Sequence, residues 1–285
     1  MNYVLYHANC PDGTGAAMAA YLKFGEDATY IAVSYGHSPP SMEDSSNVWI
    51  IDFSYPRDTL LTLKDRHPNL VVLDHHATAE ADLKGLDFCT FDMNCSGAFL
   101  AWKHFHPGVL VPLLVLYVQD RDLWHFKLPF SREISAAIGS YPLDFRIWAE
   151  WLKNGNSVEE LLREGLACLR LQKQQVDKMA KNHRWAVFYS GGGVELTNIR
   201  PNSLGASTQG EWTAPAANAT VFFSEVGEVL LELHPDAPFS AYFFDRADGN
   251  RQWGLRSRPG FDCSVVAKSF GGGGHRQASG FTQPL

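Results

Sequence analysis

Short apolar runs alternate with amphipathic segments through the first part of this chain, and no other feature constrains the fold as strongly. The runs that predict strands are residues 3–6, 30–34, 48–51 and 70–73, and the segments that predict helices are residues 13–24 and 57–66. Near-continuous apolar strands separated by amphipathic helices are typical of a parallel sheet covered on both faces. The sequence therefore predicts an N-terminal α/β domain built around such a sheet.

Polar groups directly follow three of the predicted strands. The stretch HANCPDG at residues 7–13 follows the first strand, Asp52 follows the run 48–51, and the triplet at residues 74–76, an aspartate and two histidines, follows the run 70–73. In open parallel sheets, ligands bind beyond the carboxyl ends of the strands, so these groups are expected at one edge. Carboxylates and imidazoles gathered there would hold two divalent cations. The predicted chemistry is metal-assisted hydrolysis.

Each of these groups also has an ordinary structural interpretation. A lone aspartate after a strand, such as Asp12, Asp52 or Asp74, is as often a helix N-cap or a turn residue as a ligand. The triplet at residues 74–76 is harder to explain in this way, because adjacent histidines can point to opposite sides, one toward a metal and one toward an oxyanion. A fourth cluster, residues 120–124, ends an apolar helix predicted from Leu110. It is either a solvated helix end or, since two acids there oppose the helix dipole, a group beside a cation.

The second half of the chain predicts a different organisation. Helices are expected at residues 96–105, 110–119 and 144–152, and a long polar helix from Ser157 to about His183 has the composition of a connector between domains. Beyond it, strands at 186–189, 194–197, 240–245 and 252–256, with helices near 222–233 and 262–270, predict a second, smaller α/β domain. The predicted boundaries are residues 1–155 for the first domain, 156–184 for the connecting helix and 185–285 for the second domain.

A run of four glycines near the C-terminus predicts a binding loop. Gly271 to Gly274 allow the backbone to approach a ligand closely, and their N–H groups can form an anion nest. His275 and Arg276 add charge-assisted donors that suit phosphate. A flexible hinge is the alternative interpretation, but the position of the run between a helix ending at Phe270 and the small residues 278–280 favours the loop.

Composition excludes several classes of function. A formal net charge of −7 argues against a protein that grips long duplex DNA, whereas a short anionic substrate stays compatible when metal ions supply positive charge. The five cysteines are scattered without a Cys-x-x-Cys pair, which favours a reducing cytoplasm over a disulfide framework. The N-terminus shows no signal-peptide pattern, and the longest apolar run, Val109 to Val118, is too short to span a bilayer. No membrane association is therefore expected.

Five motifs in order along the chain make it similar to one known family. They are residues 7–13, Asp52-Phe53-Ser54, residues 74–76, residues 120–124, and Gly272-Gly273-Gly274-His275 followed by Ala278-Ser279-Gly280-Phe281. With these motifs, nearly the whole chain resembles the DHH phosphoesterase family, including its C-terminal DHH-associated domain. The resemblance implies a manganese-dependent phosphoesterase. The family includes single-strand exonucleases, oligoribonucleases, cyclic dinucleotide phosphodiesterases and, with a different C-terminal domain, inorganic pyrophosphatases.

The resemblance also implies roles for individual residues. Two Mn²⁺ ions, with Mg²⁺ or Zn²⁺ as alternatives, would be held by a set of histidines and acids: His7, Asp12, Asp52 (between the ions), His75 and one acid of the pair Asp120 and Asp122. Asp74 would orient His75, and His76 would face the scissile phosphate. The expected substrate-binding residues are Gly272, Gly273, Gly274, His275, Arg276 and Arg256.

The first motif departs from the family pattern. Family members usually carry Asp-x-Asp where this chain offers only Asp12, so either Cys10 stands in place of the first aspartate or Thr14 in place of the second. One metal site is then weaker, uses the Cys10 thiolate, or forms only with substrate bound. A thiolate ligand would shift the preference of the site toward softer metals such as zinc.

Together these patterns predict a two-domain α/β protein with its active site in the cleft between the domains. The expected reaction is hydrolysis of phosphodiester bonds in short single-stranded oligonucleotides or related nucleotides, as in oligoribonucleases and exonucleases. The alternatives are a phosphodiesterase for cyclic dinucleotides or small phosphate esters, and a catalytically weakened nucleotide-binding module. The sequence does not specify the physiological metal or the preference for RNA or DNA. The oligomeric state also stays open, with a homodimer as one alternative.

Overall fold

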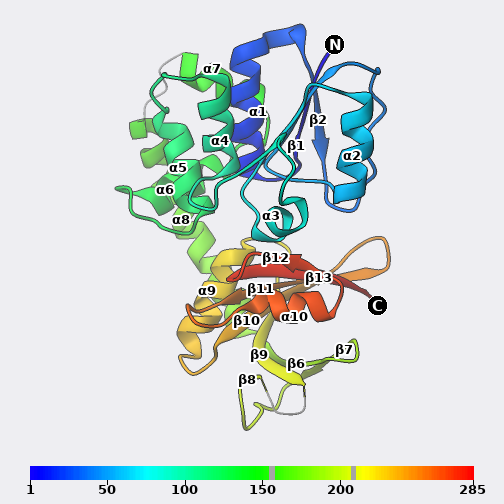
Figure 1. Cartoon of the computed structure of the whole chain (residues 1–285). Coiled ribbons are helices and arrows are strands. Elements are labelled where there is room, and N and C mark those ends of the chain that lie inside the picture. Colours follow the sequence, from blue (N-terminus) through cyan, green and yellow to red (C-terminus); the bar gives the residue numbers. More distant parts are fainter. Residues whose placement is uncertain (154–157, 207–209) are drawn as a thin grey trace. The chain divides into compact units, whose positions relative to one another are not determined.

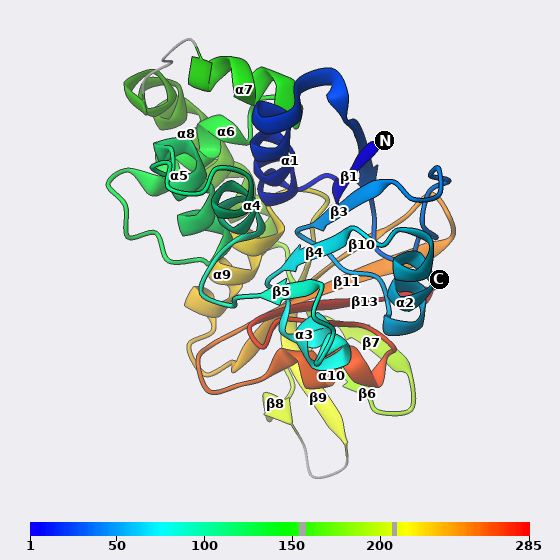
Figure 2. The same cartoon turned by 45° about the horizontal axis from the view of Figure 1, so that its top comes forward.

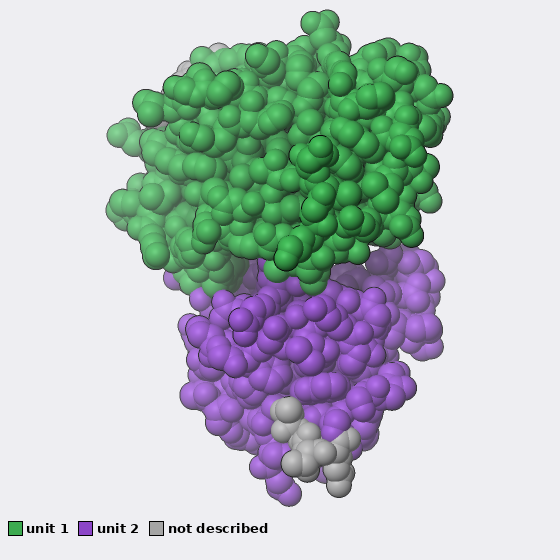
Figure 3. All heavy atoms as spheres, in the orientation of Figure 1, with its two compact units in different colours: residues 1–169 green, residues 170–285 purple. Residues whose placement is uncertain are grey.

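The computed structural model describes residues 1–153, 158–206 and 210–285 of the chain. They divide into two compact units, Met1–Leu169 and Arg170–Leu285 (Figure 3). Helix α8, Val158–Lys181, contributes to both units, because the division falls within it. Ser157, the predicted first residue of this long helix, lies outside the described residues, and the predicted boundaries at residues 155 and 184 stay predictions.

The sheet of the first unit has five strands, all parallel, in the order β2-β1-β3-β4-β5. Strands β1 and β2 are labelled in Figure 1, and β3, β4 and β5 in Figure 2. The strands are β1 Asn2–His7, β2 Thr29–Val33, β3 Asn47–Ile51, β4 Leu70–Asp74 and β5 Cys89–Phe91. The first four match the apolar runs of the sequence, whereas the three residues of β5 are too few to give a pattern. The predicted parallel sheet is therefore confirmed.

Helices cover both faces of this sheet (Figure 2). Successive side chains of a strand point to opposite faces, so Val4 packs in one core cluster and Leu5 in the other. The helices on the Val4 face are α1 Pro11–Phe24, α4 Gly97–Phe105, α5 Leu113–Asp122, α6 Ser131–Ile138 and α7 Phe145–Lys153. The helices on the Leu5 face are α2 Arg57–Arg66 and α3 Ala77–Leu83. Burial on both faces explains why the strands are apolar throughout.

Helix α1 begins and packs as its sequence dictates. Pro11 opens the first turn, where its missing N–H costs nothing, and Gly25 ends the helix with a φ of +55°. Small residues on its buried face allow close packing, and a Cβ at Gly15 would lie 2.9 Å from the Ala98 Cβ of α4. Helices α1 and α4 are thereby held near each other beside the carboxyl edge of the sheet.

Helix α5 differs from its prediction. It begins at Leu113 instead of Leu110, because Pro112 precedes it and residues before a proline avoid the helical region. It also extends to Asp122, so the cluster at residues 120–124 includes its last turn. In the part of the chain that the structure describes, no helix is long and apolar enough to cross a membrane.

The second unit has a mixed sheet in the order β12-β13-β11-β10-β9-β6-β7, with β8 paired to β9. Its strands are β6 Arg184–Tyr189, β7 Gly193–Thr197, β8 Gly205–Ala206, β9 Glu211–Asn218, β10 Phe239–Asp245, β11 Asn250–Ser257, β12 Gly273–Gly274 and β13 Ala278–Pro284. Helix α9, Phe223–Leu233, and helix α10, Cys263–Ser269, pack on this sheet. The second α/β domain of the prediction is confirmed, although β9 and β13 lie outside the predicted strands.

Candidate metal centre

Asp52 is the residue around which the carboxyl edge of the first sheet is organised. It follows β3, and only 1% of its surface is exposed. Its Oδ1 lies 3.2 Å from His75 Nε2, and its Oδ2 lies 3.5 Å from His7 Nδ1. Among the described residues, this buried Oδ2 makes no hydrogen bond, which is costly unless a cation binds it. One carboxylate therefore faces two groups of potential ligands.

The first group consists of Asp12, His75 and Asp122, whose ligand atoms all lie within 4.8 Å of one another. His75 Nε2 is 3.5 Å from Asp12 Oδ2 and 3.6 Å from Asp122 Oδ2. These separations exceed a good hydrogen bond. They match the spacing of ligands around one ion, about 3–3.5 Å when each ligand is about 2.1 Å from the metal. Oxygen ligands with one imidazole suit Mn²⁺ or Mg²⁺.

The second group consists of His7, Cys10 and Asp52, again with ligand atoms within 4.8 Å of one another. His7 ends β1, and Cys10 is the residue immediately before α1. The hydroxyl of Thr14 donates instead to the carbonyl oxygen of Cys10 at 2.9 Å. Of the two positions that the sequence left open, Cys10 belongs to this ligand group, whereas the Thr14 hydroxyl is engaged with the backbone.

Backbone groups fix the position of Asp12 at the start of α1. Its Oδ2 accepts a hydrogen bond from the N–H of Gly97 at 2.6 Å, and its Oδ1 accepts one from Ala98 at 2.9 Å. Both donors belong to the first turn of α4, where unpaired N–H groups and the helix dipole stabilise a carboxylate. The first turn of α4, which comes much later in the sequence, therefore fixes the position of the Asp12 carboxylate.

Two glycines leave the space that this arrangement requires. A Cβ at Gly97 would lie 2.5 Å from the Asp52 Cβ, and a Cβ at Gly13 would lie 2.1 Å from the carbonyl oxygen of His7. Asp52 itself has a φ of +63°, a left-handed conformation that aspartate and asparagine adopt more readily than most residues. Gly97 belongs to no predicted motif, and its role is visible only in three dimensions.

Asp74 holds the ring of His76. Its Oδ1 accepts a hydrogen bond from His76 Nδ1 at 2.7 Å and one from the backbone N–H of His75 at 2.7 Å. Its Oδ2 accepts a hydrogen bond from the Ser54 hydroxyl at 2.5 Å. The structure thus corrects the prediction that Asp74 orients the His75 ring. An aspartate that opens a turn reaches groups up to two residues ahead, and here it reaches the second histidine.

The buried acids raise the proton affinity of their neighbours. Although desolvation opposes it, the carboxylates of Asp52, Asp12 and Asp122 raise the pKa of His75 to about 10. Burial, followed by the charges of Asp52 and Asp122, raises the pKa of Asp12. Burial and the same charges raise the pKa of the Cys10 thiol. A divalent cation offers the positive charge that these groups otherwise take from protons.

The structure separates Asp122 from Asp120, the acid named first in the prediction. The carboxylate of Asp120 accepts hydrogen bonds from the backbone N–H groups of Lys127 at 2.9 Å and Leu128 at 3.0 Å. The Ser131 side chain and these two bonds lower the pKa of Asp120, although desolvation opposes the shift. Asp120 therefore fixes the loop that follows α5, and Asp122 is the acid of this pair that lies in the His75 group.

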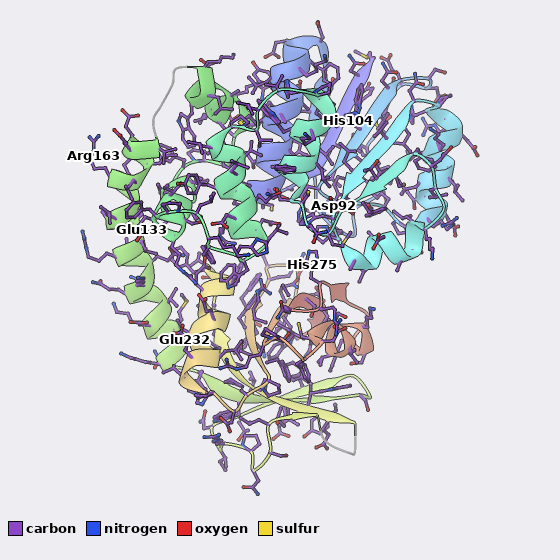
Figure 4. All side chains as sticks on the ribbon, turned by 60° about the vertical axis from the view of Figure 1, so that its left-hand side comes forward. Asp92, His104, Glu133, Arg163, Glu232 and His275 are labelled. Atoms are coloured by element: carbon purple, nitrogen blue, oxygen red, sulfur yellow. The ribbon has the colours of Figure 1, made fainter. Side chains whose placement is uncertain are left out.

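Two further residues at this edge show what the sequence does and does not reveal. Asp92 follows β5 (Figure 4), but its carboxylate accepts from the N–H of Asn94 at 2.9 Å and from the Cys95 thiol at 3.3 Å, within its own turn. Tyr35 follows β2, and its ring centroid lies 4.9 Å from that of His7. No motif in the sequence singles out Tyr35. The sequence feature that could have indicated Tyr35 is its position shortly after a predicted strand of the parallel sheet.

In the second unit, the glycine run 271–274 has a structural explanation. The N–H groups of Gly271 and Gly272 donate to the carbonyl oxygens of Lys268 and Ala267 at 3.0 and 2.9 Å. A Cβ at Gly272 would lie 2.1 Å from the carbonyl oxygen of Gly280 in β13. Gly272 is therefore needed for close packing against β13, and an anion nest built on the Gly271 and Gly272 N–H groups is excluded.

The predicted substrate-binding side chains of this unit differ in availability. His275 lies between β12 and β13 (Figure 4), and Arg276 follows it with 76% of its side chain exposed and its Nε 3.4 Å from Asp262 Oδ2. Arg256 donates from Nη2 to the Ser224 hydroxyl at 2.8 Å, and its guanidinium lies 5.5 Å from the centroid of the Tyr242 ring. Arg276 is thus open to a ligand, whereas Arg256 already stabilises the packing of α9 on the sheet.

Comparisons with known proteins agree with this architecture. No family model matches the chain. An uncharacterized protein of Acanthamoeba polyphaga mimivirus is 28% identical, over 98% of this chain and 67% of its own length. The structure of RecJ from Thermus thermophilus in complex with Mn²⁺ superposes with a TM-score of 0.50 at 15% identity. The chain has a DHH-like fold.

The superposition on RecJ covers 98% of this chain but only 49% of the RecJ chain, so the protein spans about half the length of that neighbour. A pGpG-specific phosphodiesterase, PggH of Vibrio cholerae, is also similar, with a TM-score of 0.47 and 13% identity over 100% of this chain and 93% of its own. At such identities the similarity concerns the fold.

Proposed function

We propose that this protein is a phosphoesterase that hydrolyses phosphodiester bonds in short single-stranded oligonucleotides or related nucleotides. It uses two divalent cations, and Mn²⁺ is the preferred ion. The observation that carries the proposal is the position of Asp52, whose two oxygens face two separate ligand groups. Two metal ions held close together by shared carboxylates are typical of enzymes that displace groups at phosphorus.

The residues of the centre would have distinct roles. His7, Cys10 and Asp52 would hold one ion, and Asp12, His75 and Asp122 would hold the other, with Asp52 shared. When bound, the ions supply Lewis acidity that activates water and offsets the charge of the phosphate. The O- and N-rich group around His75 favours Mn²⁺ or Mg²⁺, whereas a Cys10 thiolate would admit Zn²⁺ at the other position.

His76 would face the reacting phosphate, and Asp74 would set its protonation. Because Asp74 accepts from Nδ1, the other ring nitrogen is the one that can reach a ligand. Although desolvation opposes it, the Asp74 hydrogen bond raises the pKa of His76. A protonated His76 donates from Nε2 to a phosphate oxygen, and such charge-assisted bonds are the stronger kind.

The preference for short substrates rests on charge. With a net charge of −7, the chain lacks the excess of cations that binds long duplexes, so local positive charge comes from the metal centre. We assign metal binding and chemistry to residues 1–155, the connection to residues 156–184, and substrate binding to residues 185–285. The alternatives are a cyclic dinucleotide or a small phosphate ester as substrate, and a weakened nucleotide-binding module.

The proposal is tested by turnover of bis(p-nitrophenyl) phosphate after removal and return of metal. We expect no hydrolysis in excess chelator and recovery with Mn²⁺, with Mg²⁺ and Zn²⁺ added separately to define the choice of metal. A ladder of short RNA and DNA oligonucleotides, together with a cyclic dinucleotide, then defines the substrate. Full activity in chelator would exclude the metal mechanism, and binding without turnover of any of these esters would favour the nucleotide-binding module.

A further inference from the structure

Tyr35 reaches the metal centre from the edge strand of the parallel sheet. Strand β2 pairs with β1 so that Val33 lies opposite His7, and the N–H of Ala8 donates to the carbonyl oxygen of Val33 at 2.9 Å. Tyr35 comes two residues after this point. The register of the two strands thus places Tyr35 at the carboxyl edge where His7 ends β1.

The Tyr35 ring packs against rings from three other strand ends. Its centroid lies 4.9 Å from that of His7 and 5.9 Å from that of His76, with interplanar angles of 67° and 78°. The ring of Phe53, which follows Asp52, lies 6.4 Å away at 89°. Tyr35 therefore contacts both a proposed metal ligand and the histidine proposed to face the phosphate.

Tyr35 is nevertheless open to a ligand. It is 53% exposed, whereas Phe53 beside it is 1% exposed. Within the described parts of the chain, its hydroxyl makes no hydrogen bond to another residue. A phenol is a neutral hydrogen-bond donor at physiological pH. A ring needed only for packing would gain more from burial than this one does.

We propose that the Tyr35 hydroxyl binds substrate by donating a hydrogen bond to a phosphoryl oxygen of the ester that is hydrolysed. The inference rests on the proposed function and adds a protein donor to the site. The centre is lined by the carboxylates of Asp12, Asp52 and Asp122, which can accept hydrogen bonds but offer no donor to a phosphate oxygen. A neutral donor beside them binds a phosphate oxygen without competing for the metal positions. A cationic side chain, by contrast, would compete with the metal ions for the carboxylates.

The decisive variant is Tyr35→Phe, which removes the hydroxyl and keeps the ring against His7 and His76. We expect Mn²⁺ affinity, measured by calorimetry, to stay within about twofold. Binding of inorganic phosphate to the Mn²⁺-loaded protein should weaken about 10- to 100-fold, the factor that one charge-assisted hydrogen bond is worth. The kcat/KM values for bis(p-nitrophenyl) phosphate and for a dinucleotide should fall by the same factor, because both carry the reacting phosphate. Tyr21→Phe is the matched control, since Tyr21 lies on α1 and its hydroxyl donates to the Glu26 carboxylate in the turn that follows this helix.

Four outcomes would overturn the inference. Unchanged phosphate binding in Tyr35→Phe, or no phosphate binding by the parent protein, would remove the proposed contact. Weakened Mn²⁺ binding would show that Tyr35 acts by positioning His7. A loss confined to the dinucleotide would place the contact on a base or sugar. The phosphate titration needs no turnover, so it decides the role of Tyr35 even where both esters resist hydrolysis and the proposed function fails.

Discussion

Asp52 combines a backbone conformation that most side chains avoid with a carboxylate that is almost fully buried. A left-handed residue costs on the order of 1 kcal/mol, and an unpaired buried oxygen costs more. Local strain of this kind persists where the surrounding structure holds it, and it is concentrated at functional sites. At the scale of single residues, Asp52 is therefore the most sensitive test of the metal centre.

Replacing Asp52 with asparagine should preserve the fold and abolish turnover. Asparagine fits the left-handed backbone and the same volume, but it loses the charge that both ligand groups share. We expect kcat to fall by at least about 10²–10³, the scale seen when one preorganised electrostatic contact is removed. The control is Asp92→Asn, because that carboxylate bonds only groups of its own turn in the described structure. Equal activity of Asp52→Asn and the parent would contradict the shared role of this carboxylate.

His75 gives the metal-free protein a characteristic pH dependence. Its pKa rises from 6.5 to about 10 in the folded state, so its contribution to stability is complete below pH 6.5 and is lost as the pH rises through 10. Thermal unfolding of chelator-treated protein should show a Tm that falls over this interval, and His75→Asn should flatten the fall. Mn²⁺ affinity should rise with pH over the same range, because the ion displaces the proton. A Tm in chelator that rises between pH 7 and 10 would contradict this assignment.

The sequence predicted His7, Asp52 and the triplet at residues 74–76 as site residues because each of these groups directly follows an apolar strand. It could not choose between Asp120 and Asp122, since two acids two residues apart in one helix turn differ only in where they point. It also gave no sign of Gly97, whose importance comes from the space beside a residue 45 positions earlier. Proximity of this kind depends on the assembled fold.

At the scale of elements, the start of α4 is as much a part of the site as the strand ends. Its first two N–H groups hold Asp12, and its first residue leaves room for Asp52. Gly97→Ala should therefore displace Asp52, since the new Cβ would meet its Cβ at 2.5 Å and its Oδ1 at 2.6 Å. We expect a loss of Mn²⁺ affinity of at least tenfold by calorimetry, because these two atoms cannot stay in place. Gly139→Ala, whose Cβ meets its nearest neighbour at 3.4 Å, should bind Mn²⁺ as the parent does. Identical affinities would show that Asp52 can move without consequence.

The order of the loop after α5 should depend directly on Asp120, whereas metal binding should depend on Asp120 only indirectly. Asp120→Asn keeps the shape but weakens the bonds to the Lys127 and Leu128 N–H groups. We expect about 1–3 kcal/mol of lost stability in denaturant unfolding, the cost of a poorly paired buried group. Asp122→Asn should do the reverse, with a small change in stability and a large loss of Mn²⁺ affinity. The opposite pattern would restore Asp120 as the ligand.

Most elements of the fold follow from periodicity and composition, and the exceptions have physical causes. Strand β9 contains Pro215, and a proline argues against a central strand because it has no N–H to donate. The pairing of β9 with β10 begins only at Ala216, so Pro215 lies outside that pairing. Strand β13 begins in small residues that carry little strand signal, and its pairing with β11 and β12 supplies the order. Where local propensity is weak, neighbouring strands decide.

At the scale of the whole molecule, the two units should differ in what their mutations change. Arg276→Ala in the second unit removes an exposed cation and no metal ligand. We expect a larger loss of kcat/KM on a dinucleotide than on bis(p-nitrophenyl) phosphate, with the difference mostly in KM, because remote contacts position the larger substrate. Arg251→Ala is the control, since its guanidinium is paired with Asp245. Equal losses on both substrates would mean that Arg276 acts on the reacting phosphate itself.

The proposed ligands of the candidate metal centre lie between residues 7 and 122, on the ends of three strands and on two helices, so an unfolded chain cannot bring them together. An ion that binds only the folded protein stabilises it by about 2.7 kcal/mol when its free concentration is a hundred times its Kd. Scarcity of the ion then raises the fraction of unfolded molecules, which proteases remove. Under the proposed function, the supply of divalent metal would set the abundance of this protein in a cell as well as its rate of turnover.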